Sequence, residues 1–477
     1  MAAEQIAPLI AADDLASVER RFEAQRQAFG QDPYPSLQRR LDGLDRLEKA
    51  LRRHEAEIRA AIALDFGNRA EQETRLIEEL ACIEGIRHAR HHLRGWMRPE
   101  RRRAAWWALP ARARVLQQPL GIVGIVVPWN YPLLLSVNPL TAALAAGNRV
   151  MIKLSEFTPR FGALFDRIIT DAFSADEVSV INGDAAVAHR FSALPFDHLL
   201  FTGSTRIGRE VMRQASENLT PVTLELGGKS PVIATDGFSL AEMARRIMFA
   251  KLVNAGQTCA APDYVLLPEG REDAFIHACR EATRDMYPTL AGNPQYTTVI
   301  NDRQYARLVA YLAEAETAGA TVHALHDEPA DPQRRSFSPV ALTGAGDTLR
   351  VMQDEIFGPI LPIVAYRRLD EAIAYVNARP RPLALYFFGG RNDRDEVLQR
   401  TLSGGVTINN VALHATQEDL PFGGVGASGM GEYHGRYGFL AFSKGRAILY
   451  DSRLSGSALL RPPYGRMYDF VMRLLYR

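Results

Sequence analysis

The chain has 477 residues, which is too long for one hydrophobic core and predicts two or three domains. Lys plus Arg (56) nearly equals Asp plus Glu (55), so the composition gives no general attraction to nucleic acid, and we expect none as a partner. Three cysteines, Cys82, Cys259 and Cys279, are too few for a disulfide scaffold; with no secretory leader in residues 1–6, they indicate a reducing, cytoplasmic location.

The first part of the chain, residues 14–110, is expected to be mainly helical. Leucines between residues 37 and 51 recur at helical spacing, and a second helix is expected from Glu71 to Arg94. The following segment, His88 to Arg114, is basic and carries three tryptophans. This pattern suits a nucleic acid or a membrane surface, but a solvated hairpin or subunit contact is the favoured interpretation.

The stretch from 115 to 148 contains no charged residue and could be mistaken for a membrane span. Four prolines divide it into pieces shorter than the roughly 20 residues that a spanning helix needs. It therefore predicts a buried strand, a loop, and a helix from about Leu133 to Ala146.

From residue 113 onward, short apolar runs alternate with helices, which predicts a mostly parallel, doubly wound α/β sheet. The expected strands are Ile122–Val127, Arg149–Lys153, Glu177–Ile181, His198–Phe201, Thr223–Leu226, Tyr264–Leu267, Thr321–His323 and Phe337–Leu342. Such sheets bind ligands at the carboxyl ends of their strands.

Two strand ends carry candidate ligand-binding residues. Lys153 and Glu156 could hydrogen-bond the two hydroxyls of a ribose, although a lysine at a strand end is usually just solvated. The turn Gly203 to Gly208 suits a phosphate at a helix N-terminus, and a plain N-cap formed by Ser204 or Thr205 is an equally good interpretation.

Two further residues have the chemistry of catalysis. Glu225 stands between two leucines at the end of an apolar run, where partial burial would raise its pKa and make it a usable base; alternatively it faces solvent on an alternating strand. Cys259 follows a predicted helix, Leu240 to Val253, in a small, glycine-containing loop that a substrate could reach. Taken alone, Cys259 is more often one more buried apolar residue.

The ordered set of motifs resembles the NAD(P)-dependent aldehyde dehydrogenases over about residues 14–450. Within that family it is most similar to the class 3 branch and to coniferyl aldehyde dehydrogenases. The matching stretches are Pro128–Pro132, Lys153–Glu156, Phe201–Gly208, Glu225–Lys229, Gly256–Cys259, Glu355–Pro359 and Pro421–Gly424.

The resemblance implies a mechanism with three catalytic residues. Cys259 attacks the aldehyde carbon, the Asn130 amide and the Cys259 N–H hold the oxyanion, and Glu225 activates the water that hydrolyses the thioester. No metal site is expected. A CoA-acylating enzyme would use the same cysteine but would not need Glu225, and a structural protein on this fold would tolerate loss of all three.

The resemblance also implies the binding residues. The cofactor is expected to be NAD, with NADP as the alternative, because a carboxylate at Glu156 repels a 2′-phosphate. The cofactor residues would be Trp129, Lys153, Ser155, Glu156, Gly203, Ser204, Gly208, Glu355 and Phe357. An aromatic or medium-chain aldehyde would lie among Tyr131, Phe249, Val253 and His414, with Phe249 and Val253 on one helical face; alternatively, Phe249 is a core residue.

The implied fold is α/β, with a Rossmann-like cofactor domain (1–98 and 119–225) and an α/β catalytic domain (226–415). A small β oligomerisation arm (99–118 and 436–455) precedes a C-terminal tail (456–477). Strand edges of the arm predict a homodimer. The tail, from Arg466 to Arg477, is an amphipathic helix with a basic side, which either packs on protein or makes weak peripheral contact with a membrane.

Overall fold

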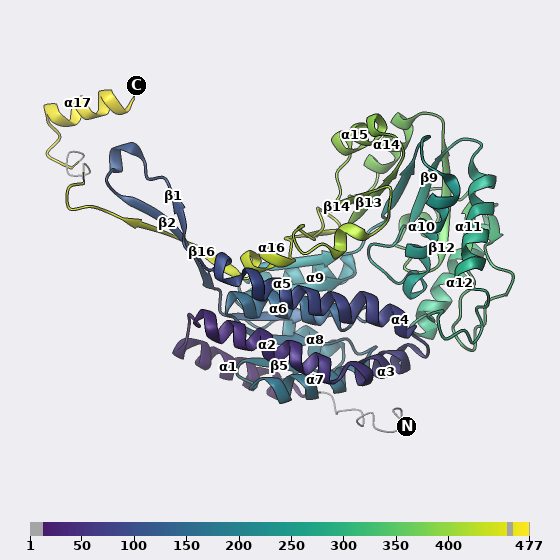
Figure 1. The fold of residues 1–477 in the computed structure, drawn as a ribbon, viewed down its shortest axis with the longest axis horizontal. Coiled ribbons are helices and arrows are strands. Elements are labelled where there is room, and N and C mark those ends of the chain that lie inside the picture. The colour runs from purple at the N-terminus through teal and green to yellow at the C-terminus, as the bar shows by residue number, and fades with distance from the viewer. Residues whose placement is uncertain (1–12, 456–460, 477) are drawn as a thin grey trace.

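The structure, a computed structural model, describes residues 13–455 and 461–476. The expectation about a secretory leader in residues 1–6 therefore lies outside the described residues, as does Arg477 of the predicted tail helix. Figure 1 shows two α/β bodies side by side, with a thin sheet standing away from them.

The first body contains a six-stranded sheet in the order β15-β7-β6-β3-β4-β5, which is parallel except at β15. Its strands are β3 (Ile122–Val126), β4 (Arg149–Lys153), β5 (Val178–Ile181), β6 (His198–Gly203), β7 (Val222–Leu226) and β15 (Gly429–Met430). The prediction of a doubly wound parallel sheet is thus confirmed.

Helices cover this sheet. They are α1 (Leu15–Gln31), α2 (Leu37–Arg53), α3 (Glu55–Phe66), α5 (Ala81–Trp96), α6 (Leu134–Ala146), α7 (Pro159–Ala172), α8 (Ala185–Ser192) and α9 (Thr205–Ser216). Because α6 is apolar on all sides, it is buried along nearly its whole length, as expected of a central helix rather than a membrane span. Within the described ranges, no helix is both long and apolar enough to cross a bilayer.

The predicted helix from Glu71 to Arg94 contains an irregularity that the sequence did not reveal. It begins as α4 (Glu71–Glu73), widens into a π-helical segment over Thr74–Leu80, and continues as α5. Since π-type hydrogen bonds run from i to i+5, Glu73 and Glu78 come to lie on the same side, and both are buried.

The second body contains a seven-stranded sheet in the order β10-β11-β12-β9-β8-β13-β14, which is parallel except at β10. Its strands are β8 (Pro231–Ala234), β9 (Tyr264–Pro268), β10 (Thr321–Ala324), β11 (Val340–Thr343), β12 (Ile360–Tyr366), β13 (Ala384–Phe388) and β14 (Gly405–Ile408). The strand predicted from Phe337 begins only at Val340, because Pro339 has no N–H to donate to a ladder.

The helices of this body are α10 (Leu240–Leu252), α11 (Glu272–Met286), α12 (Asp302–Thr317), α13 (Arg350–Gln353), α14 (Leu369–Asn377) and α15 (Arg391–Arg400). In α10, Met243, Ile247 and Met248 pack into the same core as Phe275 of α11. The helix delivers the chain to the loop that carries Cys259.

A three-stranded antiparallel sheet stands off the two bodies (Figure 1) and consists of β1 (Glu100–Arg102), β2 (Arg112–Pro119) and β16 (Ser443–Tyr450). The hairpin interpretation of the basic segment is thus correct for this part. Residues 435–441, most of which we expected in the β arm, instead form helix α16 (Gly435–Ala441), which packs on α5 and α6. Helix α17 (Arg466–Leu475) lies beyond the arm, and none of its residues is buried.

Candidate active site

The loop that carries Cys259 has an unusual backbone. After α10 ends, Asn254 and Ala255 both have φ of 52°, and Gly256 has φ of 74°. Three consecutive residues in the left-handed region are costly, and asparagine and glycine are the types that tolerate it best. A Cβ on Gly256 would lie 2.5 Å from the Gly358 carbonyl oxygen, so only glycine fits there.

Cys259 is partly exposed and packs beside the core of the first body. Burial of the thiol, followed by the negative charges of Glu355 and Glu225, raises the pKa of Cys259 to about 12, while N–H groups of Ala260 and Cys259 act in the opposite direction. The surrounding protein by itself therefore keeps the thiol protonated at neutral pH. Cys82 and Cys279, by contrast, are fully buried.

Asn130 and Tyr131, on the loop after β3, lie directly against the Cys259 loop. The buried Asn130 side chain donates from Nδ2 to the Gln257 carbonyl oxygen at 3.1 Å. The Tyr131 hydroxyl lies 2.5 Å from the hydroxyl of Thr258, the residue before Cys259. The structure thus brings together the two parts of the oxyanion site that the resemblance implies, although they are more than a hundred residues apart.

Glu225, on β7, is the second group near the thiol. It is 3% exposed, and within the described part of the chain neither of its carboxylate oxygens has a hydrogen-bond partner. Burial, and then the charge of Glu432, raise the pKa of Glu225 well above its usual range. The alternative that Glu225 faces solvent is therefore wrong, and a carboxylate destabilised in this way is a strong base toward water.

Glu355 lies over the end of the same strand. A Cβ added to Gly227 would come 1.8 Å from its Oε2 atom, so the glycine makes room for the carboxyl group. Burial and the charge of Asp263 raise the pKa of Glu355 to about 8, although the Gly228 N–H donates to it. Two residues on, Phe357 meets the Trp129 ring edge-on at 5.4 Å.

The predicted ribose-binding residues lie at the carboxyl end of β4. Lys153 is buried rather than solvated, and its Nζ donates to the carbonyl oxygens of Leu154 at 2.5 Å and Gly183 at 2.8 Å. Burial lowers its pKa, and Glu156 opposes this shift. Glu156 itself is exposed, and Ser155 accepts a hydrogen bond from the Phe157 N–H.

The turn from Gly203 to Gly208 is a helix start, as the N-cap interpretation expected. Ser204 caps α9 by accepting from the Ile207 N–H at 3.5 Å. A Cβ on Gly208 would come 2.6 Å from Leu226 Cδ2, so this glycine lets α9 pack closely on β7. Neither role prevents an anion from binding to the other N–H groups of the turn.

The predicted substrate residues are placed differently from one another. His414 is buried, binds Thr407 Oγ1 through Nδ1 at 2.7 Å and packs near Tyr386 and Phe422; burial lowers its pKa to about 4 and keeps it neutral. Val253 is buried beyond the end of α10, whereas Phe249 is 52% exposed. The Val253 N–H donates to the Phe249 carbonyl oxygen, so the two residues lie one helical turn apart, as the i and i+4 spacing predicted. The alternative that Phe249 is core is wrong.

Sequence reasoning missed a buried charged cluster that touches this site. Arg69, Glu73 and Glu78 have almost no exposed side-chain surface and bind the loops of Asn130 and Cys259. The one sequence signal is the pair of glutamates in a helix whose neighbours are apolar. Arg69 itself stands in a short Gly67-Asn68 turn, which gives no sign of burial.

Comparisons with known proteins agree with this geometry. The sequence pattern described as "Aldehyde dehydrogenase family" matches residues 2–448. A Pseudomonas aeruginosa protein named "Probable coniferyl aldehyde dehydrogenase" is 47% identical over 465 residues, covering 97% of this chain and 96% of that protein. Substrate-bound AldH of Staphylococcus aureus superposes with a TM-score of 0.91 at 36% identity, covering 96% of this chain and 99% of that one.

A Mycobacterium tuberculosis aldehyde dehydrogenase complexed with NAD+ also matches, with a TM-score of 0.83 at 26% identity over 92% of this chain and 91% of that one. The sequence pattern covers both bodies and nearly all of the arm, and the relatives match over nearly their full length. With the cysteine, asparagine and glutamate gathered as described, the chain belongs to the aldehyde dehydrogenase family, the NAD(P)-dependent oxidoreductases of aldehydes.

Proposed function

We propose that the protein oxidises an aromatic or medium-chain aldehyde to the free carboxylic acid, using Cys259, Asn130 and Glu225. Cys259 first loses its thiol proton to solvent; the thiolate sulfur then adds to the aldehyde carbon, and the resulting oxyanion accepts hydrogen bonds from the Asn130 amide and the Cys259 N–H. A bound nicotinamide ring supplies the hydride acceptor. Loss of hydride leaves a thioester on Cys259; Glu225 takes a proton from water, hydroxide adds to the thioester carbon, and the C–S bond breaks to give the acid and the thiolate.

The observation that carries this proposal is the state of Glu225. It is a buried carboxyl group without a hydrogen-bond partner in the described residues, and its charge acts on the Cys259 thiol. Such a group is unfavourable for stability, which supports a chemical task. In an enzyme that transfers its acyl group to the thiol of CoA, no base for water would be needed, so Glu225 favours hydrolysis.

The residues present fit a dinucleotide. Lys153 has two of its three donors on carbonyl groups, which leaves one for a ribose hydroxyl beside Glu156 and Ser155. Gly203, Ser204 and Gly208 would lie along the pyrophosphate. Glu355, whose Oε1 atom is buried without a partner in the described chain, would bind the nicotinamide ribose, with Phe357 and Trp129 beside it. The Glu156 carboxylate favours NAD over NADP.

The substrate proposal rests on the aromatic surroundings of the Cys259 loop. Tyr131 touches Thr258, and the His414 ring packs near Tyr386, whose hydroxyl donates to the Ala260 carbonyl oxygen. Buried Val253 completes the apolar wall, and exposed Phe249 would lie nearer the entrance. Flat, apolar walls favour aromatic aldehydes over acetaldehyde, and the named relative supports a coniferyl-type substrate.

The test is NADH absorbance on mixing the protein with NAD and benzaldehyde, with and without CoA, followed by product analysis. We expect NADH formation without CoA and benzoic acid as the product. Benzoyl-CoA as the product would overturn the hydrolytic assignment. A kcat/KM for acetaldehyde above the values for benzaldehyde and hexanal would reject the substrate class.

We further propose that residues 1–98 and 119–225 form the cofactor domain and residues 226–415 the catalytic domain. The arm (residues 99–118 and 436–455, with α16 belonging to the body) would pair with a second copy in a cytoplasmic homodimer. Helix α17 would make weak contact with a membrane surface. The strand edges of the arm, which have no partner within residues 13–455 and 461–476, and the exposed apolar face of α17 support these two contacts.

A further inference from the structure

Behind the Cys259 loop lies an ionic cluster that the reaction described above does not use. The side chains of Arg69 and Glu78 are 0% exposed and that of Glu73 is nearly as buried. The Arg69 guanidinium lies over the rings of Phe66 and Tyr131, 5.0 and 4.9 Å from their centroids. Taking three charges out of water is expensive, and a buried ion pair is weak support for stability. Stability alone therefore does not explain why these three charged side chains are buried here.

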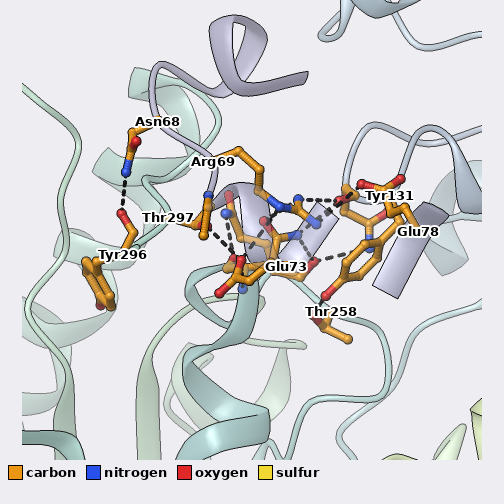
Figure 2. Close-up of polar contacts among 12 residues, drawn as sticks. Asn68, Arg69, Glu73, Glu78, Tyr131, Thr258, Tyr296 and Thr297 are labelled. Carbon is orange, nitrogen blue, oxygen red and sulfur yellow. Dashed lines mark hydrogen bonds and ion pairs between the residues drawn. The ribbon is translucent and has the colours of Figure 1, made fainter. Parts of the chain in front are cut away.

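Arg69 connects two loops that come from different bodies. Its Nη1 donates to the Asn130 carbonyl oxygen at 3.0 Å and to Asn254 Oδ1 at 2.7 Å. Figure 2 shows Arg69 together with Glu73 and Glu78, with dashed lines running from its guanidinium group. Its Nη2 donates to Glu78 at 3.4 Å, and Nε lies 3.6 Å from Glu73. A planar guanidinium can hold several acceptors at fixed angles, which a lysine ammonium cannot do.

The two carboxylates each hold one of the same loops. Glu73 Oε2 accepts from the Asn254 N–H at 3.0 Å and from the Thr297 hydroxyl at 2.7 Å. Glu78 Oε2 accepts from the N–H groups of Leu133 and Leu134, at the start of α6, three and four residues after Asn130. The π-helical segment places both carboxylates on the side of Arg69, and such segments often occur at functional sites.

Asn254, which Arg69 and Glu73 hold in place, is in turn hydrogen-bonded to Asn130 and to the loop that carries Cys259. Its Nδ2 donates to the Asn130 carbonyl oxygen at 3.0 Å and to the Gln257 carbonyl oxygen at 3.1 Å. The Gln257 carbonyl oxygen is also the acceptor of the Asn130 side-chain amide. Backbone and side chain of Asn130 are therefore both fixed relative to the left-handed turn that precedes Cys259.

We propose that Arg69 is a positioning residue for the reaction: by binding the Asn130 carbonyl and the Asn254 side chain together, it sets the Asn130 amide against the Cys259 N–H. Glu73 and Glu78 each bind Arg69 and one of the two loops, and so fix the position of the loops relative to Arg69. The inference rests on the proposed role of Asn130 in binding the oxyanion. Arg69 itself touches neither the aldehyde nor the thiol.

The test is a double-mutant cycle on the pre-steady-state burst of NADH with benzaldehyde. Arg69→Lys keeps the buried charge but cannot reach both acceptors, and Asn130→Ala removes the amide while keeping the carbonyl that Arg69 binds. We expect Asn130→Ala to slow the burst about 10²- to 10³-fold. Arg69→Lys should slow it about 10- to 100-fold, because a small misplacement of reacting groups has effects of this size.

The informative variant is the double one. If Arg69 acts through Asn130, adding Arg69→Lys to Asn130→Ala should slow the burst by no more than about threefold further, since the two changes remove one function. The dissociation constant for NAD should stay within about twofold, which separates positioning from cofactor binding. As a control, Arg59→Lys alters a similar pairing of Arg59 with Glu71 and Glu79 that does not reach the loop, and it should leave the burst unchanged.

Two results would overturn the proposal: an unchanged burst in Arg69→Lys, or losses that multiply in the double variant. If Arg69→Lys does not fold, Asn254→Gly takes its place in the same cycle, because glycine adopts the positive φ freely and only the side-chain bonds are lost. An unchanged burst in the single variant Asn130→Ala would instead reject the oxyanion role of Asn130. This variant therefore distinguishes a failure of the proposed function from a failure of the proposal about Arg69.

Discussion

Glu225 is a residue whose surroundings define its task. The strand alternation in the sequence left open whether its side chain points to solvent, and the structure places it inside, without a partner in the described residues. Its raised pKa means that the protein pushes the carboxylate toward taking up a proton. That property suits the second half of the reaction, in which a water molecule must lose one.

Replacing Glu225 by Gln should therefore separate the two halves of the reaction. The amide has the same shape but cannot accept a proton from water, so we expect a burst of about one NADH per subunit followed by turnover reduced about 10²- to 10⁴-fold. Stopped-flow absorbance measures both phases. Cys259→Ala is the matched control and should show neither phase while still binding NAD. Equal loss of both phases in Glu225→Gln would contradict the assignment.

The reaction needs the thiolate form of Cys259, but the surroundings of the thiol raise its pKa to about 12. In cofactor-free protein, the rate of alkylation by iodoacetamide should follow the thiolate fraction. It should rise from pH 7 to pH 10 without a plateau, by about tenfold per pH unit above pH 9 and by less around pH 8, where Glu355 ionises. A plateau near pH 8 would show that the thiolate forms far more easily than the surroundings indicate.

Glu355 provides the matched variant for this measurement. Its charge is the largest cause of the raised Cys259 pKa after burial, and its own pKa is raised to about 8. Glu355→Gln should therefore speed alkylation several-fold near pH 9, where the wild-type carboxylate is ionised, and change it little near pH 6, where it is protonated. Cys259→Ala gives the background from the two buried cysteines.

Among the elements, prediction succeeded where a segment is buried on all sides. Strand β4 was predicted with both bounds correct, because the apolar run Val150–Ile152 stands between two charged residues, Arg149 and Lys153, and every residue of the strand is buried. The widening of the helix at Thr74–Leu80 was missed, since no residue type marks it. The partners of Glu73 are Arg69, Asn254 and Thr297, and the last two are distant in the sequence; periodicity contains no information on such contacts.

The short left-handed turn before Cys259 positions the catalytic loop. A substitution at Gly256 tests whether the reaction requires this backbone conformation. Gly256→Ala would bring a Cβ to 2.5 Å from the Gly358 carbonyl oxygen and force a left-handed alanine. We expect a loss of about 3 kcal/mol in the free energy of unfolding, as the sum of strain and overpacking. The NADH burst should fall by about 10²-fold or more, because the loop must move.

Gly292 is a control with the same positive φ. It has the same φ of 74°, but a Cβ added there meets nothing within 4 Å. Gly292→Ala should therefore lose only about 1 kcal/mol and keep its burst. Urea unfolding and stopped-flow absorbance on both variants give the comparison. Equal losses in both would mean that strain, and not contact with Gly358, constrains the Cys259 loop.

At the scale of the whole molecule, the arm should decide the oligomeric state. Among the residues that the structure describes, its three strands leave two edges without a partner, and Trp106, Leu449 and Tyr450 are all more than half exposed. Light scattering at micromolar concentration should give twice the chain mass of 53.0 kDa. Leu449→Asp should shift the mass toward one chain, whereas Leu402→Asp, at a leucine outside the arm that is also more than half exposed, should not. A monomeric wild-type protein would reject the homodimer.

The C-terminal helix is the other exposed apolar surface. Met467, Phe470 and Leu474 are each at least half exposed, and Arg466 and Arg473 add positive charge. Figure 1 shows α17 beyond the arm, away from the two α/β bodies. Packing on its own subunit is therefore not what the structure shows. The apolar face of α17 therefore contacts either a neighbouring subunit or a lipid surface. The ten residues of α17 are too few to span a bilayer.

Contact with a lipid surface and contact with a neighbouring subunit predict different results in a vesicle-binding experiment. An interfacial helix binds through its apolar face together with attraction to anionic headgroups. Full-length protein should therefore pellet with anionic vesicles at low salt, and a chain ending at Gly465 should not. Binding should weaken several-fold at high salt, where charges are screened. Phe470→Ser with Leu474→Ser should abolish it while keeping every charge. If full-length and truncated protein pellet equally but the truncated chain loses the dimer, then the helix covers a neighbouring subunit, and the membrane contact is excluded.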